Sequence, residues 1–452
     1  MYYMRELYRK IDSAIKDFYK TPKKALMLTG ARQTGKTYAV RRFGKDFKAY
    51  AEINFIDNPE AKEIFRNYNG VSELLLRISA FVRFDLIPGE TLIFFDEVQE
   101  CPELITAIKF LVDDGTYSYI MSGSLLGVEM RDIRSLPVGY VGIREMYPLD
   151  IEEFMLNLGI SADLISRLRE CWEDIKPVDE VIHGRMLEVF RLYLVVGGMP
   201  AAVVEYLETN NLRRVLHVQL DILNLYRLDI SKYSERDKLK IREIFDIIPS
   251  ELDAKNKRFI LKRLNEHAKF ERYKESFLWL KDAGVAIPVY NVSEVREPLR
   301  LSENRSLFKL FSNDVGLLCA QYGQGLQMKV LTDAADINFG SVFENVAAQE
   351  FAAHGFSIYY YNNKRRGEVD FVLSIGGEAV PVEIKSGKSY TEHRALSGLM
   401  EASEPYIKRA YVFSHSNLYM EGRIIYVPIY MLMFVKRGND TLGLYSLDLS
   451  GL

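Results

Sequence analysis

The sequence predicts an α/β protein with several domains, and three observations lead to this prediction. Over residues 1–150, short apolar runs alternate with helix-like stretches, as in a parallel sheet covered by helices on both faces. The next stretch, to about residue 334, has mainly helical apolar spacing. From about residue 335, extended runs return with two helices among them, which indicates a second α/β unit.

A glycine-rich loop joins the first strand-like run, Ala25 to Thr29, to a helix-like run. Residues 30–37 read GARQTGKT and fit G-x-x-x-x-G-K-[ST] at every fixed position. Glycine lets backbone N–H groups turn inward around phosphates, and the following helix N-terminus favours their negative charge. We therefore expect Lys36 to reach the phosphates of ATP and the Thr37 hydroxyl to hold Mg²⁺. The predicted nucleotide-binding set also contains Gly30, Arg32, Gln33, Thr34 and Gly35.

Two further strand ends carry polar residues. Thr91 to Phe95 is a continuous apolar run that ends in Asp96 and Glu97, as expected for a buried parallel strand with a ligand at its carboxyl end. We expect Asp96 to bind the magnesium through water and Glu97 to orient and deprotonate the attacking water. The next strand-like run ends at Ser122, whose hydroxyl is placed to sense the γ-phosphate.

Composition narrows the class of protein. The chain has 452 residues, 48% hydrophobic and 27% charged, which is ordinary for a globular protein of about three domains. A net charge of −3 means that any nucleic-acid surface is local. The three cysteines have neither disulfide nor metal spacing, which suits a reducing compartment. Without a membrane-length apolar run or a signal peptide, a cytoplasmic location and no membrane contact are expected.

The middle of the chain is predicted to be helical and then to form a second small module. Residues 151–234 carry helical apolar faces around the turn at 197–200 and indicate a lid or spacer beside the first domain, 1–150. Residues 235–334 give three helical segments followed by a hairpin, the plan of a winged helix. DNA is a candidate partner of its basic residues, Lys255, Lys257, Arg258, Lys262 and Arg263. Acidic residues are interleaved with them, so a solvated face remains the alternative.

The last domain, 335–452, contains a second set of chemically active residues. Glu383 and Lys385 are two apart on a strand and face the same side, and the Gly376-Gly377 turn brings Asp370 toward them. Two carboxylates can hold a divalent cation, and a nearby lysine can steady or deprotonate the attacking water. Glu344, on the preceding helix, can add a third carboxylate. The alternative is a salt bridge on a solvated face.

The whole pattern resembles a known family. The chain is similar to the prokaryotic P-loop ATPases of the AAA-like/STAND group, whose C-terminal domain of unassigned function has a restriction-endonuclease-like, PD-(D/E)xK fold. The motifs that support the resemblance are residues 30–37, 94–99, 122–124, 147–149 with 152–154, 197–200, 367–371 and 382–385. The resemblance implies ATP hydrolysis and a nuclease-like fold, with no assigned substrate.

One position departs from the family pattern. Members carry Gly-Arg before the Tyr-Pro-Leu segment, whereas here Gly139 is followed by Tyr140. An arginine that contacts the γ-phosphate must then be another one, for which Arg131, Arg134 and Arg144 are candidates.

Two functional hypotheses remain open at this point. In the first, the nucleotide state of the ATPase controls a Mg²⁺-dependent nuclease domain that acts on DNA. In the second, the chain is a nucleotide-driven switch or scaffold that binds DNA or a protein partner and uses an inactive nuclease fold for docking. A homo-oligomer is compatible with both hypotheses.

Overall fold

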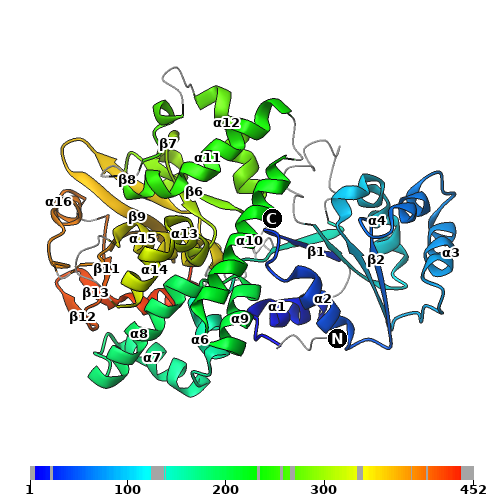
Figure 1. Cartoon of the computed structure of the whole chain (residues 1–452), viewed down its shortest axis with the longest axis horizontal. Helices are drawn as coiled ribbons and strands as arrows, with labels where there is room; N and C mark the ends of the chain where they lie inside the picture. The colour runs from blue at the N-terminus through cyan, green and yellow to red at the C-terminus, as the bar shows by residue number, and fades with distance from the viewer. Residues whose placement is uncertain are drawn as a thin grey trace, which may run out of the picture.

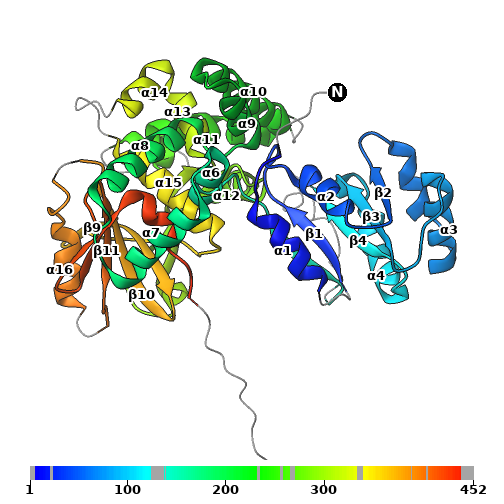
Figure 2. The ribbon, with the colours of Figure 1, turned by 90° about the horizontal axis from the view of Figure 1, so that it is seen from below.

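The computed structural model shows two sheets joined by helices. It describes residues 6–20, 24–123, 137, 139–231, 235–254, 258–264, 270–332, 339–387, 389–403 and 406–438. A parallel sheet lies at one end of the molecule, and a larger mixed sheet lies toward the other end (Figure 1). Helices α9 (Pro200–Thr209) and α10 (Leu212–Ser231) lie between them in both views (Figures 1 and 2).

The N-terminal part is the predicted parallel sheet with its helices. Its elements are α1 (Lys10–Tyr19), β1 (Ala25–Thr29), α2 (Lys36–Gly44), β2 (Ala49–Asn54), η1 (Pro59–Phe65), α3 (Val71–Val82), β3 (Thr91–Asp96), η2 (Val98–Glu100), α4 (Pro102–Asp114), β4 (Ser118–Ser122) and β5 (Val141–Glu145). The strand order is β2-β3-β4-β1-β5, and every neighbouring pair is parallel. Strand β3 is buried along its whole length. The carboxyl ends of β1, β3 and β4 therefore meet at one edge, beside the glycine-rich loop.

The helical middle follows directly. It contains α6 (Ile151–Leu158), α7 (Ala162–Asp174), α8 (Glu180–Val196), α9, α10, α11 (Glu235–Asp253), η4 (Leu261–Arg263) and α12 (Phe270–Asp282). The turn between α8 and α9 requires glycine because other parts of the chain approach it closely. A Cβ on Gly197 would lie 2.3 Å from Oδ1 of Asp314, and one on Gly198 would lie 2.1 Å from the carbonyl oxygen of Leu149.

The C-terminal part is built on an eight-stranded mixed sheet. Its elements are β6 (Ala286–Val292), η5 (Leu299–Ser302), β7 (Glu303–Ser312), α13 (Val315–Tyr322), α14 (Gln324–Leu331), α15 (Gly340–Ala353), β8 (Tyr359–Asn363), β9 (Gly367–Ile375), β10 (Glu378–Ile384), α16 (Arg394–Ala402), β11 (Ala410–Ser414), β12 (Tyr419–Glu421), β13 (Ile424–Pro428) and η6 (Ile429–Phe434). The strand order is β12-β13-β11-β10-β9-β8-β6-β7. Helix α16 packs on one face, while α15 and the helical middle cover the other.

The winged-helix prediction for 235–334 is not confirmed. Helices α11 and α12 and the β6–β7 hairpin are present, but β6 also pairs in parallel with β8, at Tyr290 with Tyr359. The hairpin therefore extends the large sheet across residue 335. One hydrophobic core likewise runs from the helical middle into the C-terminal part, from Leu149 to Val435. The division into four domains stays a prediction.

No helix within the described ranges combines the length and the apolar character needed to span a bilayer.

Candidate functional site

The glycine-rich loop between β1 and α2 has the backbone shape that its sequence predicts. Gly30 has a φ of +120°, and a Cβ there would lie 2.2 Å from the carbonyl oxygen of Met146. Gly35 has a φ of +93° and precedes the first turn of α2, where no side chain caps the helix. The first N–H groups of α2 therefore face the loop with no side-chain acceptor, which suits a phosphate.

The side chain of Lys36 lies against the backbone of this loop. Its Nζ donates to the carbonyl oxygens of Gly30 and Ala31, at 2.8 Å each. Burial lowers the pKa of Lys36 to about 8, although the carboxylates of Glu97 and Asp96 oppose this shift. The two acceptors are neutral carbonyls, so a phosphate oxygen would be a stronger partner for this ammonium group.

The ends of α2, β3 and β4 meet at Asp96. Its Oδ2 accepts from the Thr37 hydroxyl at 2.9 Å and from the Asn54 amide at 3.2 Å, and its Oδ1 accepts from the Ser122 hydroxyl. Burial raises the pKa of Asp96, while the two hydroxyls act in the opposite direction. The structure thus brings together Thr37, Asp96 and Ser122, which are far apart in the sequence. A carboxylate with two hydroxyls is an oxygen set that suits Mg²⁺.

Glu97 lies next to this group in a left-handed backbone conformation, with a φ of +56°. Its side chain accepts from Nε2 of Gln99 at 2.6 Å, and its backbone N–H donates to Oδ1 of Asp96 at 3.1 Å. Glu97 also lines the cleft beside the loop. A carboxylate at this place can reach a water molecule in the cleft.

This cleft has a volume of about 910 Å³ and lies between the parallel sheet and α9. One wall carries the loop residues Arg32, Gln33, Gly35, Lys36 and Thr37 with Glu97, and the opposite wall carries Pro200, Ala201, Val204, Glu205 and Glu208. Thr34, within the loop, is fully buried, and its hydroxyl donates to the carbonyl oxygen of Ala31. The cradle, the lysine and the oxygen set together fit ATP with Mg²⁺.

Sequence reasoning missed two residues that hold the loop from outside. Arg9 is buried and donates to the carbonyl oxygen of Thr34 at 2.9 Å and to that of Tyr147 at 2.7 Å, and it pairs with Glu153 at 3.2 Å. Asp229 of α10, 5% exposed, pairs with Arg32 at 2.9 Å. Neither contact has a local sequence signal, because its partners lie at least 25 residues apart.

The helical middle also contacts the loop backbone. The Tyr226 hydroxyl of α10 donates to the carbonyl oxygen of Arg32 at 3.3 Å. Gly284, with a φ of +72°, lies so close that a Cβ there would approach the backbone nitrogen of Ala31 to 2.8 Å. The loop is therefore held by residues outside the parallel sheet on several sides.

Of the three candidate γ-phosphate arginines, the structure describes Arg144 alone. Arg131 and Arg134 lie outside the described residues. Arg144 is exposed on β5, with its guanidinium 6.0 Å from the centre of the Phe18 ring.

The C-terminal acidic centre contains a residue that the sequence analysis did not assign. Lys309 of β7 is 0% exposed. Its Nζ lies 2.6 Å from Oε1 of Glu368, 3.4 Å from Oε2 of Glu344 and 4.0 Å from Oδ1 of Asp370. Glu344 and Asp370 therefore meet as predicted, but they meet around an internal ammonium group.

The other predicted residues of this centre already have protein partners. Lys385 Nζ lies 2.8 Å from Oε1 of Glu383, and Oδ2 of Asp370 accepts from the backbone N–H of Ile384 at 2.9 Å. Burial raises the pKa of Glu383. Within the described residues, no group of three or more His, Cys, Asp or Glu is arranged to hold a metal ion. The carboxylates as they stand do not fit the predicted metal, and its assignment to Glu344, Asp370 and Glu383 stays a prediction.

The basic residues predicted to contact DNA are only partly described. Lys255 and Lys257 lie outside the described residues, as does the side chain of Lys262. Arg263 pairs with the buried Glu251 at 2.7 Å, so part of its charge is used within the fold. DNA contact by this segment stays a prediction.

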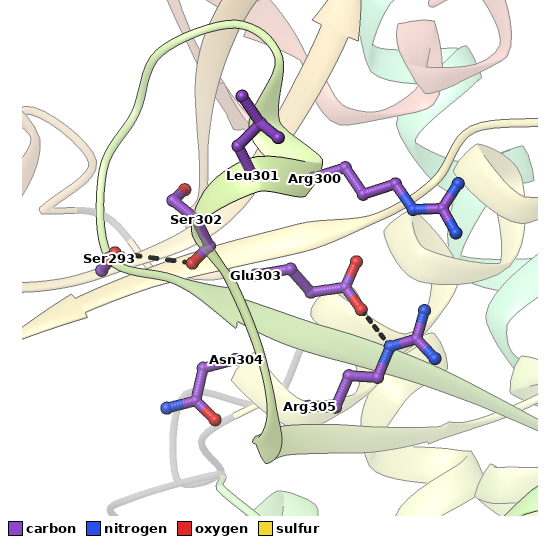
Figure 3. Close-up of a pocket in the computed structure, with 7 residues that line it drawn as sticks. All are labelled: Ser293, Arg300, Leu301, Ser302, Glu303, Asn304 and Arg305. Atoms are coloured by element: carbon purple, nitrogen blue, oxygen red, sulfur yellow. Dashed lines mark hydrogen bonds and ion pairs between the residues drawn. The ribbon is translucent and has the colours of Figure 1, made fainter.

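A second hollow of about 610 Å³ lies where η5 runs into β7. Arg300 and Arg305 extend to the same side, and Glu303 lies between them and pairs with Arg305 at 2.5 Å (Figure 3). None of the predicted site residues lines this hollow.

Three family descriptions match consecutive parts of the chain. Residues 22–155 match the family described as AAA domain. This match agrees with the parallel sheet and the glycine-rich loop, so the first part of the chain has the fold of a P-loop ATPase domain. Residues 187–328 match a domain of unknown function (DUF8612), and residues 339–432 match another (DUF4143). No curated protein matches the chain.

Several solved structures are similar at low sequence identity. A Walker-type ATPase of Pyrococcus abyssi is 16% identical, with 70% of this chain and 96% of that chain covered and a TM-score of 0.43. The ORC1 protein of Aeropyrum pernix, solved in complex with DNA, is 13% identical, with 73% and 94% covered and a TM-score of 0.31. Cdc6p of Pyrobaculum aerophilum is 14% identical, with 72% and 92% covered and a TM-score of 0.27. These similarities are too distant to support a functional argument.

Proposed function

We propose that the chain is an ATP-hydrolysing switch, in which the nucleotide at the glycine-rich loop controls the helical and C-terminal parts. The observation that supports the proposal is the set of contacts between the loop and residues that follow the parallel sheet in the chain. Asp229, Tyr226 and Gly284 all contact the loop, although none of them belongs to the parallel sheet or the helices on it. A change in the loop on nucleotide binding must alter these contacts.

In this proposal, the loop N–H groups, Arg32 and Lys36 bind the phosphates. Thr37 and Asp96 hold Mg²⁺, which when bound neutralises phosphate charge. Glu97 accepts the proton of the attacking water, and Ser122 orients the carboxylate of Asp96 through its hydroxyl. The apolar part of the cleft wall, from Pro200 to Val204, excludes water from the bound nucleotide.

One route from the loop leads to β7. Arg32 is held through its backbone by Tyr226, and the Tyr226 hydroxyl in turn accepts from the side-chain amide of Asn313 at 3.3 Å. Asn313 follows the last residue of β7, the strand that carries Lys309. Contiguous polar contacts thus connect the loop with a strand of the C-terminal acidic centre.

A second route leads to α15. Arg9 links the Thr34 carbonyl to Glu153 of α6, and the first N–H of α6, at Ile151, donates to Oε1 of Glu350 at 2.8 Å. Glu350 is fully buried in α15, the helix that carries Glu344. Both routes therefore end on elements of the acidic centre.

The ion pair between Arg32 and Asp229 is the element that a nucleotide can exchange. A phosphate beside the loop competes with Asp229 for the guanidinium of Arg32, since both are anions. When Arg32 turns to the phosphate, α10 loses an ionic contact with the loop.

The test is the ATP affinity of Asp229→Asn. Removing the competing charge should tighten ATP binding about 5-fold, the equivalent of a partly exposed ion pair of about 1 kcal/mol. Asp221→Asn, on the exposed face of the same helix, is the matched control. Unchanged affinity in Asp229→Asn, measured by calorimetry, would show that the phosphate and Asp229 do not compete.

The C-terminal part is the output of this switch, and DNA or a protein is its candidate partner. The competing hypothesis, a Mg²⁺-dependent nuclease under nucleotide control, predicts that plasmid or single-stranded DNA is cut when Mg²⁺ or Mn²⁺ is added. The switch proposal predicts no cleavage with either metal, with or without ATP.

A further inference from the structure

Lys309 is the central residue of the C-terminal acidic centre. It stands in the apolar run Leu307 to Phe311 and is completely removed from solvent. Burying an ammonium group is unfavourable unless carboxylates or other acceptors surround it. The carboxylates of Glu344, Glu368 and Asp370 lie within 4.0 Å of its Nζ, and the Tyr360 ring centre is 5.2 Å away.

We infer that Lys309 is a built-in cation that takes the place of a divalent metal in this nuclease-like centre. The centre is then a permanent ion cluster that holds β7, α15 and β9 together, with no requirement for Mg²⁺ or Mn²⁺. This inference is independent of the ATP switch, because it concerns only the C-terminal residues.

The geometry leaves little place for a metal beside Lys309. Mg²⁺ binds oxygen at about 2.1 Å, so a Mg²⁺ on the nearer Glu344 oxygen would lie within about 5.5 Å of the ammonium nitrogen. Two positive charges at that separation repel each other inside a buried cluster. One oxygen of Asp370 and one of Glu383 are also engaged, because Ile384 donates to Asp370 and Lys385 donates to Glu383.

One acceptor in the centre is left over. Oε2 of Glu383 is buried without a hydrogen-bond partner. Mg²⁺ requires near-octahedral coordination by six oxygens, usually with one or two carboxylates among its ligands. A single unpaired oxygen therefore supplies too few ligands to hold a metal. It does identify Glu383 as the carboxylate with an oxygen that an added ion could contact.

The experiment measures Mn²⁺ binding by electron paramagnetic resonance on the full chain without nucleotide. The wild type should show no Mn²⁺ site that Asp370→Asn removes. Lys309→Met keeps the length of the side chain, removes its charge and leaves three carboxylates uncompensated. It should gain one equivalent of bound Mn²⁺, and the double variant with Asp370→Asn should lose it again. Lys281→Met, at an exposed lysine of α12, should behave as the wild type does.

Two results would overturn the inference. The first is a Mn²⁺ site in the wild type that is lost in Asp370→Asn, because the metal would then coexist with Lys309. The second is a folded Lys309→Met protein that binds no additional Mn²⁺, because the lysine would then not be what excludes the metal. If Lys309→Met does not fold, the comparison of wild type with Asp370→Asn still tests the inference. A Mn²⁺ site that Asp370→Asn removes would overturn it, and the absence of such a site would support it.

Discussion

Lys36 and Lys309 are both buried lysines at the centre of a predicted catalytic site, yet different groups hold them. Lys36 donates to two neutral backbone carbonyls and lines a cleft of about 910 Å³. Lys309 is surrounded by three carboxylates, one from α15 and two from β9, and has no exposed surface. Burial lowers the pKa of the first lysine to about 8, while the carboxylates raise the pKa of the second above its ordinary value.

The difference shows what makes a charged residue available for a ligand. A lysine that is bonded to neutral carbonyls gains energy when an anion enters, because a charge-assisted hydrogen bond is stronger than a neutral one. A lysine that is already surrounded by carboxylates does not gain energy in this way when an anion enters. Removing such a lysine leaves the buried carboxylates without a counter-charge. In our proposal, the same residue type is a ligand-binding group at Lys36 and a structural counter-ion at Lys309.

The largest expected effect is that of Lys36→Ala on nucleotide binding. Without its ammonium group, the loop should bind ATP at least about 100-fold more weakly, since the lost hydrogen bonds involve charged groups. Lys309→Met should change ATP affinity far less than Lys36→Ala does, because Lys309 has no contact with the loop. Lys45→Ala, at an exposed lysine just after α2, serves as the control for charge alone. Unaltered ATP binding by Lys36→Ala would remove the basis of the comparison.

The second-largest expected effect is on the rate of ATP hydrolysis. Glu97→Gln should reduce the rate of ATP hydrolysis about 10²–10⁴-fold, the usual contribution of a general base, and should leave ATP binding intact. The bound nucleotide keeps its contacts because Lys36, Thr37 and Asp96 are unchanged. Glu100→Gln, at a nearby exposed glutamate that pairs with Lys62, should hydrolyse at the normal rate. A Glu97→Gln protein with normal turnover would place the base elsewhere.

The smallest expected effect is on the pH dependence of stability, at Asp314, where the helical middle meets the end of β7. Burial raises the pKa of Asp314 to about 6, although the backbone N–H of Gly198 donates to it. Between pH 4 and 6 the folded protein therefore binds more protons than the unfolded chain. Asp314 thus contributes up to about 3 kcal/mol of stability at low pH, which is lost as the pH rises through 6.

Asp314→Asn does not titrate and tests this assignment. The variant should be less stable at pH 4, because the side-chain oxygens of Asp314 accept from the N–H groups of Gly198 and Leu317. Its deficit in melting temperature relative to the wild type should narrow between pH 4 and 6. A deficit that stays constant over this range would show that the pKa of Asp314 is not raised.

The arrangement of the candidate nucleotide site was largely predictable from the sequence because its signals are local. The glycine loop spans eight residues, and Asp96 and Ser122 each end a continuous apolar run. Parallel pairing then brings these ends together without further information. The contacts of Arg9 and Asp229 with the loop were not predictable, because they depend on how distant helices pack.

The C-terminal centre was predicted only in part. The carboxylates of Glu344, Asp370 and Glu383 can be identified from strand and helix spacing, whereas Lys309 stands in a mainly apolar run, Leu307 to Phe311, and has no such spacing signal. A lysine between Phe308 and Leu310 in such a run is itself a signal of a buried cation that needs carboxylates. The winged-helix prediction was not confirmed because β6 pairs with β8, nearly 70 residues away, and no local pattern reveals that pairing.

Hydrogen exchange of the full chain, with and without a non-hydrolysable ATP analogue, tests the coupling most directly. The switch account predicts altered protection at 223–230 in α10, at 151–155 in α6 and at 283–286, in addition to the loop. Lys36→Ala with the same analogue should show none of these changes. Altered protection confined to residues 25–145 would contradict the account, because the nucleotide would then act on the parallel sheet domain alone.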